Sequence, residues 1–174
     1  MKIGPALTKT ALQECFAIRR TVFIEEQGIP EAEEWDDIDD KATHFLAWGD
    51  SGPIATARLY RDGGSARIGR VAVMGDQRGT GLGRKIMHYV LRHAKDNGFD
   101  GAVLDAQTYA LPFYEGLGFI AEGPEFDDGS GYVTIYGQAI NDEVQFFLPL
   151  PLDAQSRERV AGNDGREVES TQTF

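Results

Sequence analysis

Hydrophobic residues recur every three to four positions in two parts of the chain, and each part is predicted to be an amphipathic helix. Thr8 can cap the first helix, which is expected to run to about Thr21. The second helix follows a glycine-rich turn and is expected to end at Asn97-Gly98. The apolar positions are Leu12, Cys15, Phe16, Val22 and Phe23 in the first helix, and Leu82, Ile86, Val90 and Ala94 in the second.

Short apolar or alternating runs bounded by glycine-containing turns predict β-strands between and after these helices. The first strands are joined by tight turns, so they should pair antiparallel, whereas a helix connects the third strand to the next. This order predicts an α/β fold with a mixed central sheet, antiparallel in its first half and parallel around the central crossover, flanked by helices. The predicted strands are 44–48, 54–60, 66–74, 102–106, 119–121, 132–136 and 143–148, with a short helix at 112–117.

The turn after residues 66–74 carries the pattern R-x-x-G-x-G, formed by Arg78, Gly81 and Gly83. A glycine-rich turn that leads from a strand into a helix exposes backbone amides at the positive end of the helix dipole, where an anion can bind. The spacing differs from a dinucleotide fingerprint, and the Arg84-Lys85 that follows Gly83 differs from a P-loop. A simple turn with a glycine cap is the alternative interpretation.

On these residues the chain resembles the GNAT acyltransferase superfamily over roughly residues 10–138. The resemblance implies a GNAT-like α/β fold, acetyl-CoA as co-substrate and a glycine-rich turn that holds the pyrophosphate of coenzyme A. It also implies that backbone groups of Val71 and Val73 pair with the pantetheine arm. The implied pyrophosphate-binding residues are Arg78, Gly79, Thr80 (also as a hydroxyl donor), Gly81, Leu82 and Gly83.

A second segment, Phe113–Phe119, resembles the F-Y-x-x-x-G-F pattern of the same family. The resemblance places Tyr114 near the thioester sulfur, where a neutral tyrosine can protonate the departing thiolate. Gln107 stands where the family often has asparagine and can make similar amide hydrogen bonds. A core aromatic on a helix is the alternative interpretation, and it is preferred for Phe113 and Phe119.

Three residues are candidates for the base that deprotonates the acceptor amine, namely Glu26, His44 and Asp105, in that order. The alternatives are a solvated loop charge for Glu26, a hydrogen-bonded strand residue for His44 and a strand-end or helix-cap role for Asp105. His88 and His93 do not share a helix face well, so we expect no metal site.

The first half of the chain narrows the resemblance to the ElaA/YjcF-like subgroup. It does so through Arg19, Val22-Phe23, Glu25-Glu26-Gln27, Asp37, Asp40, His44 and Arg58. Those relatives usually carry a late E-D-G-I-P-H segment, but this chain has Tyr132 in place of the histidine, which leaves the acceptor open. The same front pattern is similar to acyl-homoserine-lactone synthases, which share the fold.

Charge is distributed unevenly along this acidic chain, which has a net charge of −11. Nine carboxylates and no basic residue lie between Glu25 and Asp40, whereas residues 58–95 hold nine Lys or Arg against two Asp. The pattern suggests a phosphate site facing an acidic loop that attracts a cationic amine. A solvated acidic surface is the alternative, as is anchoring of the loop by Asp37 and Asp40 against Arg19 or Arg58.

Composition also limits the location and partners of the protein. The acidic balance argues against a general nucleic-acid binder, and a single cysteine, Cys15, excludes a disulfide framework. No apolar run approaches the roughly 20 residues of a membrane span, and the first residues lack the apolar core of a signal peptide. We therefore expect a cytoplasmic protein without membrane or nucleic-acid partners.

The sequence thus predicts an N-acyltransferase that moves an acetyl group from acetyl-CoA to a primary amine of a small molecule or an exposed protein amine. A non-catalytic acyl-CoA sensor and a lactone-synthase-like acyltransferase are the alternatives. The predicted domain covers residues 1–148. Residues 149–174 are predicted to be either a disordered or loosely docked tail, or a homodimer arm that begins with the apolar residues 146–152.

Overall fold

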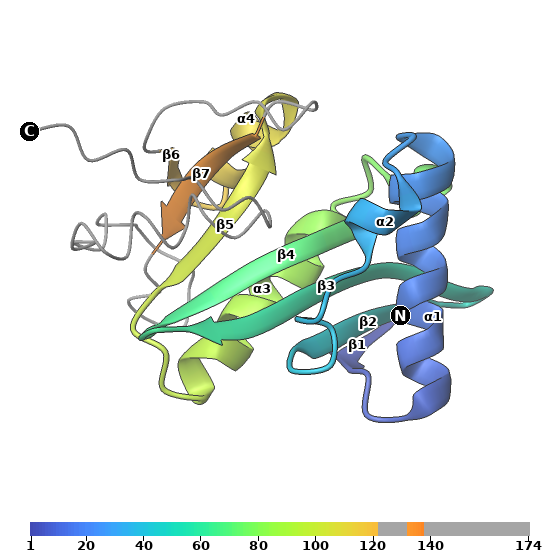
Figure 1. The fold of residues 1–174 in the computed structure, drawn as a ribbon, viewed down its shortest axis with the longest axis horizontal. Coiled ribbons are helices and arrows are strands. Elements are labelled where there is room, and N and C mark those ends of the chain that lie inside the picture. The colour runs from blue at the N-terminus through green and yellow to red at the C-terminus, as the bar shows by residue number, and fades with distance from the viewer. Residues whose placement is uncertain (122–131, 138–174) are drawn as a thin grey trace, which may run out of the picture.

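The computed structural model describes residues 1–121 and 132–137 of the chain (Figure 1). The predicted strand 143–148, the domain boundary at residue 148 and the tail lie outside these residues. The strands are β1 (Lys2–Pro5), β2 (Thr43–Gly49), β3 (Gly52–Asp62), β4 (Ser65–Val73), β5 (Ala102–Gln107), β6 (Ile120–Ala121) and β7 (Tyr132–Gly137). The helices are α1 (Lys9–Arg19), α2 (Glu31–Glu34), α3 (Leu82–Asp96) and α4 (Leu111–Glu115), with a π-helix η1 (Arg20–Glu26) and short 3₁₀ turns η2 (Gly75–Gln77) and η3 (Thr108–Ala110).

The strands form one mixed sheet in the order β1-β2-β3-β4-β5-β7-β6. Strands β1 to β4 pair antiparallel, β4 pairs parallel with β5, and β5, β7 and β6 pair antiparallel again. The crossover between the two parallel strands is α3, which forms over the apolar stripe predicted for it. The predicted α/β architecture is therefore confirmed, with the parallel relationship confined to the central strand pair.

Strands β4 and β5 form a fork in the middle of the sheet. They pair only at Ala66–Ala102 and Arg67–Val103, and Figure 1 shows them separating beyond this point. Just beyond Arg67, the pairing of β4 with β3 has an irregularity, next to which Arg70 has a φ of 51°. A bulge bends its strand, so the end of β4 continues in a changed direction on the far side of this irregularity.

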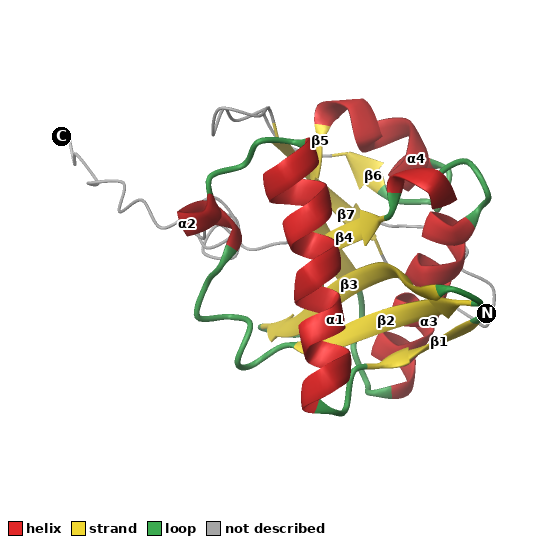
Figure 2. Ribbon diagram, turned by 90° about the vertical axis from the view of Figure 1, so that its right-hand side faces the viewer, coloured by secondary structure: helices red, strands yellow, loops and turns green. Residues whose placement is uncertain are grey.

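Helices α1 and α3 cover opposite faces of the sheet (Figures 1 and 2). Because side chains alternate along a strand, Leu46 faces α1 while its neighbours Phe45 and Ala47 face α3. The larger core lies under α3 and continues to α4, and the smaller one lies under α1. Cys15 is fully buried in the smaller core.

The first helix begins where it was predicted, because Thr8 Oγ1 accepts a hydrogen bond from the Ala11 amide at 3.1 Å. It does not end near Thr21, however. The chain continues as the π-helix η1 to Glu26, which carries this residue and Gln27 to the open end of the fork. The second predicted helix ends as expected, with Asn97 as its C-cap and Gly98 at a φ of 72°.

Candidate active site

The end of β4 has an edge that faces the opening of the fork and that no described strand covers. Met74 donates its amide to the Ile54 carbonyl at 3.0 Å on the β3 side. Backbone groups alternate in direction along a strand, so those of Val71 and Val73 point toward β5. Strand β5 pairs with β4 only at Ala66 and Arg67, so no described strand lies against the β5-facing edge of β4 at Val71 and Val73. The side chains of both valines pack against the larger core, which fixes this edge in place.

The turn that follows β4 has the backbone geometry that its glycines permit. Gly79 and Gly81 have φ values of 75° and 81°, which other residues rarely adopt. The N-cap of the 15-residue helix α3 is Gly81, which has no side chain that could accept a hydrogen bond from the first amides of the helix. The hydroxyl of Thr80 donates to the Gln77 carbonyl at 2.7 Å. Its proton therefore stabilises the turn in this structure.

Arg78 connects this turn to two other elements. Its Nε donates to the Val73 carbonyl at 3.0 Å, and its Nη2 donates to Glu26 at 2.5 Å. Glu26, the first candidate for the base, therefore lies at the glycine-rich turn and is ion-paired there.

Tyr114 lies at the end of the core next to α3. It is 8% exposed, and its ring packs edge-to-face against Phe113 and Phe119, with centroid distances of 4.9 and 6.0 Å. Burial raises the pKa of the Tyr114 hydroxyl well above its usual value near 10. The side chain is consequently neutral at physiological pH and retains a proton that it can donate.

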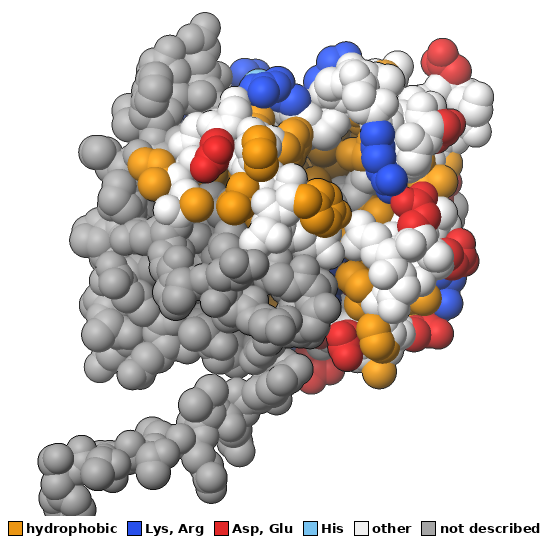
Figure 3. Space-filling view, turned by 90° about the horizontal axis from the view of Figure 1, so that it is seen from above, with side chains coloured by type: hydrophobic (Ala, Val, Ile, Leu, Met, Phe, Trp, Pro, Cys, Tyr) orange, Lys and Arg blue, Asp and Glu red, His pale blue; other side chains and the backbone are white. Residues whose placement is uncertain are grey.

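Gln107 ends β5 and contacts the end of η1. Its amide nitrogen donates to Gln27 Oε1 at 3.3 Å, and its oxygen accepts from the Tyr109 hydroxyl at 2.5 Å. The preceding residue, Glu26, contacts Arg78 in the turn after β4. Two consecutive residues at the end of η1 therefore contact both branches of the fork, Glu26 on the β4 side and Gln27 on the β5 side. Figure 3 shows this end of the molecule from above, with hydrophobic side chains gathered near Lys and Arg side chains.

His44 lies apart from the fork, in a buried polar cluster. It pairs with Arg58 across β2 and β3, so β3 stands between it and the edge of β4. The side chain is 5% exposed, and Nε2 lies 3.0 Å from the carbonyl oxygen of Asp39. Burial lowers the pKa of His44 below its usual value. The structure thus matches the hydrogen-bonded strand residue that was the alternative interpretation.

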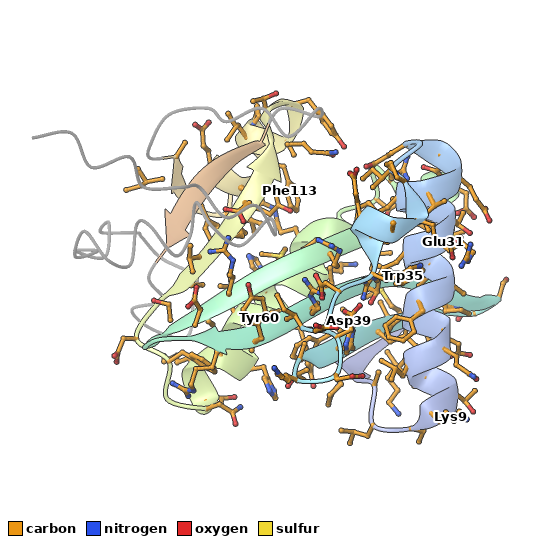
Figure 4. The ribbon with its side chains drawn as sticks, in the orientation of Figure 1. Lys9, Glu31, Trp35, Asp39, Tyr60 and Phe113 are labelled. Carbon is orange, nitrogen blue, oxygen red and sulfur yellow. The ribbon has the colours of Figure 1, made fainter. Side chains whose placement is uncertain are left out.

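Asp105 lies at the base of the fork, two residues after Val103, the last β5 residue that pairs with β4. Its carboxylate accepts a hydrogen bond from Arg67 and is 28% exposed. Arg67 pairs with Tyr60 across β3 and β4, and Figure 4 shows Tyr60 on the same face of the sheet as Asp39. This is the face that α1 and α2 border, so Asp105 points to the side on which the acidic loop lies.

The acidic segment between Glu25 and Asp40 is anchored by arginines from other elements. Three arginines make these contacts: Arg19 from α1, Arg58 from β3 and Arg70 from β4. The side chains of Arg19 and Arg58 are buried, and that of Arg70 is 27% exposed. The pairs are Arg19–Glu34 (2.5 Å), Arg19–Asp39 (2.6 Å), Arg58–Asp36 (2.6 Å), Arg58–Asp39 (2.7 Å), Arg70–Glu34 (3.0 Å) and Arg70–Asp36 (3.4 Å).

These pairs change the interpretation of the charge pattern. Anchoring of the loop against Arg19 and Arg58 is confirmed, but its carboxylates are Glu34, Asp36 and Asp39 in place of the expected Asp37 and Asp40. With the pairs Glu26–Arg78 and Glu31–Arg20, five of the nine carboxylates are bound to arginines. Most of the acidic run therefore neutralises basic residues from elsewhere in the chain. The sequence signal for this network was a long acidic segment without any internal counterion.

Among the described residues, no group of three or more His, Cys, Asp or Glu is arranged to hold a metal ion. In the same part of the chain, every helix is too short or too polar to cross a bilayer.

A family profile described as "Acetyltransferase (GNAT) domain" matches residues 13–134, which include the fork, the glycine-rich turn and Tyr114. The chain belongs to the GNAT acetyltransferase family. It is accordingly an acyltransferase. A Bacillus subtilis relative named "Uncharacterized N-acetyltransferase YjcF" is 32% identical over 119 residues, which are 68% of this chain and 85% of the relative. The chain is therefore a family member of the ElaA/YjcF type.

Solved structures of GNAT proteins have the same fold. An acyl-CoA N-acyltransferase from Pseudomonas aeruginosa superimposes with a TM-score of 0.69 and 28% identity, covering 78% of this chain and 96% of that protein. Escherichia coli ElaA gives a TM-score of 0.69 at 24% identity, covering 78% and 97% of the two chains. The GNAT fold predicted from the sequence is therefore confirmed.

Proposed function

We propose that this GNAT enzyme transfers an acetyl group from acetyl-CoA to a primary amine, which attacks the thioester directly. The observation that carries the proposal is the fork between β4 and β5, where no described strand pairs with the β5-facing edge of β4 at Val71 and Val73, beside the turn formed by Gly79 and Gly81. A chain that contains amides, such as pantetheine, can pair with this edge as an added strand. The turn and the start of α3 then supply amides for the attached pyrophosphate.

Tyr114 is the proposed general acid. Its buried, neutral hydroxyl can protonate the thiolate that leaves when the thioester is cleaved. The GNAT resemblance of the Phe113–Phe119 segment places it near the sulfur, and the packing of Phe113 against α3 keeps α4 next to the glycine-rich turn.

Asp105 is the proposed acceptor-side carboxylate. It lies at the base of the fork, and contact with Arg67 orients its carboxylate. It can hold an ammonium group and take up its proton, directly or through water. Glu26 is a weaker candidate for this role because its ion pair with Arg78 holds it at the glycine-rich turn, where the pyrophosphate is proposed to bind. His44 is weaker because it lies behind β3. The acceptor is proposed to be a small-molecule amine or an exposed protein amine.

Two measurements test the proposal. Acetyl-CoA should raise the melting temperature, because a ligand at 100 times its Kd stabilises the native state by about 2.7 kcal/mol. Thiol release across a panel of amines should then identify acceptors, and Asp105→Asn should lower turnover while acetyl-CoA still binds. The absence of a thermal shift at saturating acetyl-CoA would contradict the proposal. Binding without turnover on any amine would favour an acyl-CoA sensor.

A further inference from the structure

Glu26 and Arg78 join the end of η1 to the turn before α3, although 52 residues separate them in the sequence. The Arg78 guanidinium uses Nη2 for Glu26 at 2.5 Å and Nε for the Val73 carbonyl at 3.0 Å. It therefore holds three elements together: the end of β4, the glycine-rich turn and η1. Lysine has a single charged nitrogen on a flexible stem and cannot reproduce a planar guanidinium that contacts two separate acceptors.

We infer that Glu26 and Arg78 form a positioning pair for acetyl-CoA, in which Arg78 fixes the turn and Glu26 fixes Arg78, and neither side chain binds phosphate. This inference rests on the proposed function, since it concerns the same coenzyme A site. It assigns Glu26, an acidic residue, to the part of the enzyme that receives an anionic ligand.

The turn needs a constraint from outside its own backbone. Gly79 and Gly81 have positive φ values, and glycine has more accessible backbone conformations than any other residue. Within the turn, the Thr80 hydroxyl contacts the Gln77 carbonyl at 2.7 Å. Arg78 adds the contact that ties the turn back to the rigid end of β4. Without the contact between Arg78 and Val73, the backbone amides of the turn would no longer be held in the orientation that binds an anion.

The positive charge of Arg78 is compensated by its ion pair with Glu26. Arg78 is the single basic residue between Met74 and Gly81, but the Glu26 carboxylate beside it offsets its charge. An arginine that served as a phosphate ligand would gain from an uncompensated charge. The arrangement in this chain is better suited to orientation than to attraction.

Glu26 also lies in contact range of the start of the turn. A Cβ on Gly75 would lie 3.5 Å from Glu26 Oε1 and 4.0 Å from Arg78 Nη1. The ion pair thus lies over the glycine that begins the connection between β4 and α3. The adjacent Gln27 contacts Gln107 on β5, so η1 has fixed points on both sides of the fork. Substitution of Glu26 should therefore weaken the affinity for coenzyme A.

The test compares coenzyme A affinity, measured by calorimetry, for the full chain and for Glu26→Gln, Arg78→Lys, Arg78→Gln and the double variant Glu26→Gln/Arg78→Lys. Glu26→Gln should weaken binding about threefold, as expected for a partly exposed ion pair. Arg78→Lys should weaken it about tenfold and resemble Arg78→Gln. The double variant should resemble Arg78→Lys alone, because the two residues act through one contact. The exposed neighbour Glu25→Gln is the matched control and should leave affinity unchanged.

Three outcomes would overturn the inference. If Arg78 binds phosphate through its charge, Arg78→Lys keeps wild-type affinity and Glu26→Gln binds coenzyme A more tightly, which is the opposite sign. If the pair is merely structural, the unliganded variants melt at lower temperature and lose kcat together with affinity. A positioning pair instead changes the KM for acetyl-CoA at constant kcat, measured with an amine that the wild type acetylates. Wild-type protein that binds no coenzyme A would refute the proposed function itself, and with it this inference.

Discussion

The ring of Phe113 packs directly against Gly83, so that a Cβ at position 83 would lie 3.3 Å from Phe113 Cζ and 3.4 Å from its Cε2. Gly83 is the last glycine of the R-x-x-G-x-G turn, and Phe113 begins the segment that carries Tyr114. The two motifs recognised separately in the sequence are therefore in contact. Figure 4 shows Phe113 beside β5, near the open end of the fork.

Replacing Gly83 with valine should destabilise the protein by about 1–3 kcal/mol, since added methyl groups would overpack the contact with Phe113. Urea denaturation measures this change. Phe113→Leu in the same chain should restore part of the loss, because it removes the ring atoms that lie closest. If the loss of stability in the double variant equals the sum of the losses in the two single variants, Gly83 and Phe113 are not coupled.

Tyr114→Phe should lower kcat by about 10²–10⁴-fold, since it removes a general acid, while coenzyme A affinity stays close to that of the wild type. Burial holds the pKa of Tyr114 above its usual value near 10. Its proton should therefore remain bound on the alkaline side of the pH–rate profile to at least about pH 10. Tyr89→Phe, at an α3 residue that is 37% exposed, is the control. Full turnover by Tyr114→Phe would exclude the assigned role.

Asp39→Asn should destabilise the native state by about 3 kcal/mol, because it leaves the buried Arg19 and Arg58 without a shared counterion. The exposed Asp37→Asn is a matched substitution in the same loop and should stay within about 0.5 kcal/mol of the wild type. Chemical denaturation at pH 7 compares the two. Similar losses in both variants would indicate a general effect of loop charge.

Stability should fall as the pH decreases below about 6.5. The pKa of His44 is lowered by burial, so the native state favours the neutral ring and the unfolded chain takes up the proton first. The stabilisation is complete above the unfolded pKa and is lost as the pH falls toward the folded one. His88, whose pKa is also lowered, is more exposed. His44→Gln should therefore flatten the dependence of Tm on pH between 6.5 and 5 more than His88→Gln does.

Local signals in the sequence were sufficient for most of the fold. The apolar stripe from Leu82 to Ala94 and the glycines before it predicted α3 and its start, because helical periodicity and glycine conformations are local properties. The irregularity near Arg70 was not predicted, since residues 65–73 look like one continuous strand. The extension of the first helix as η1 was also missed, because its end contacts residues more than 50 positions away.

The site was predictable in its backbone parts and less so in its charged side chains. The family resemblance pointed to Val71 and Val73, and the glycine-rich pattern pointed to the turn of Gly79 and Gly81. The partners of Glu26 and His44 depend on how the folded chain brings arginines and carboxylates together. A list of acidic residues cannot show which of them face arginines such as Arg58.

The fork has a consequence for solubility and storage of the enzyme. An unpaired strand edge is a template for another strand, and natural proteins usually cover or interrupt such edges. Here the edge of β4 that no described strand covers is in the centre of the sheet, and the proposed coenzyme arm would cover it during turnover. Coenzyme A should therefore slow aggregation of the purified protein and protect the amides of Val71 and Val73 from hydrogen exchange.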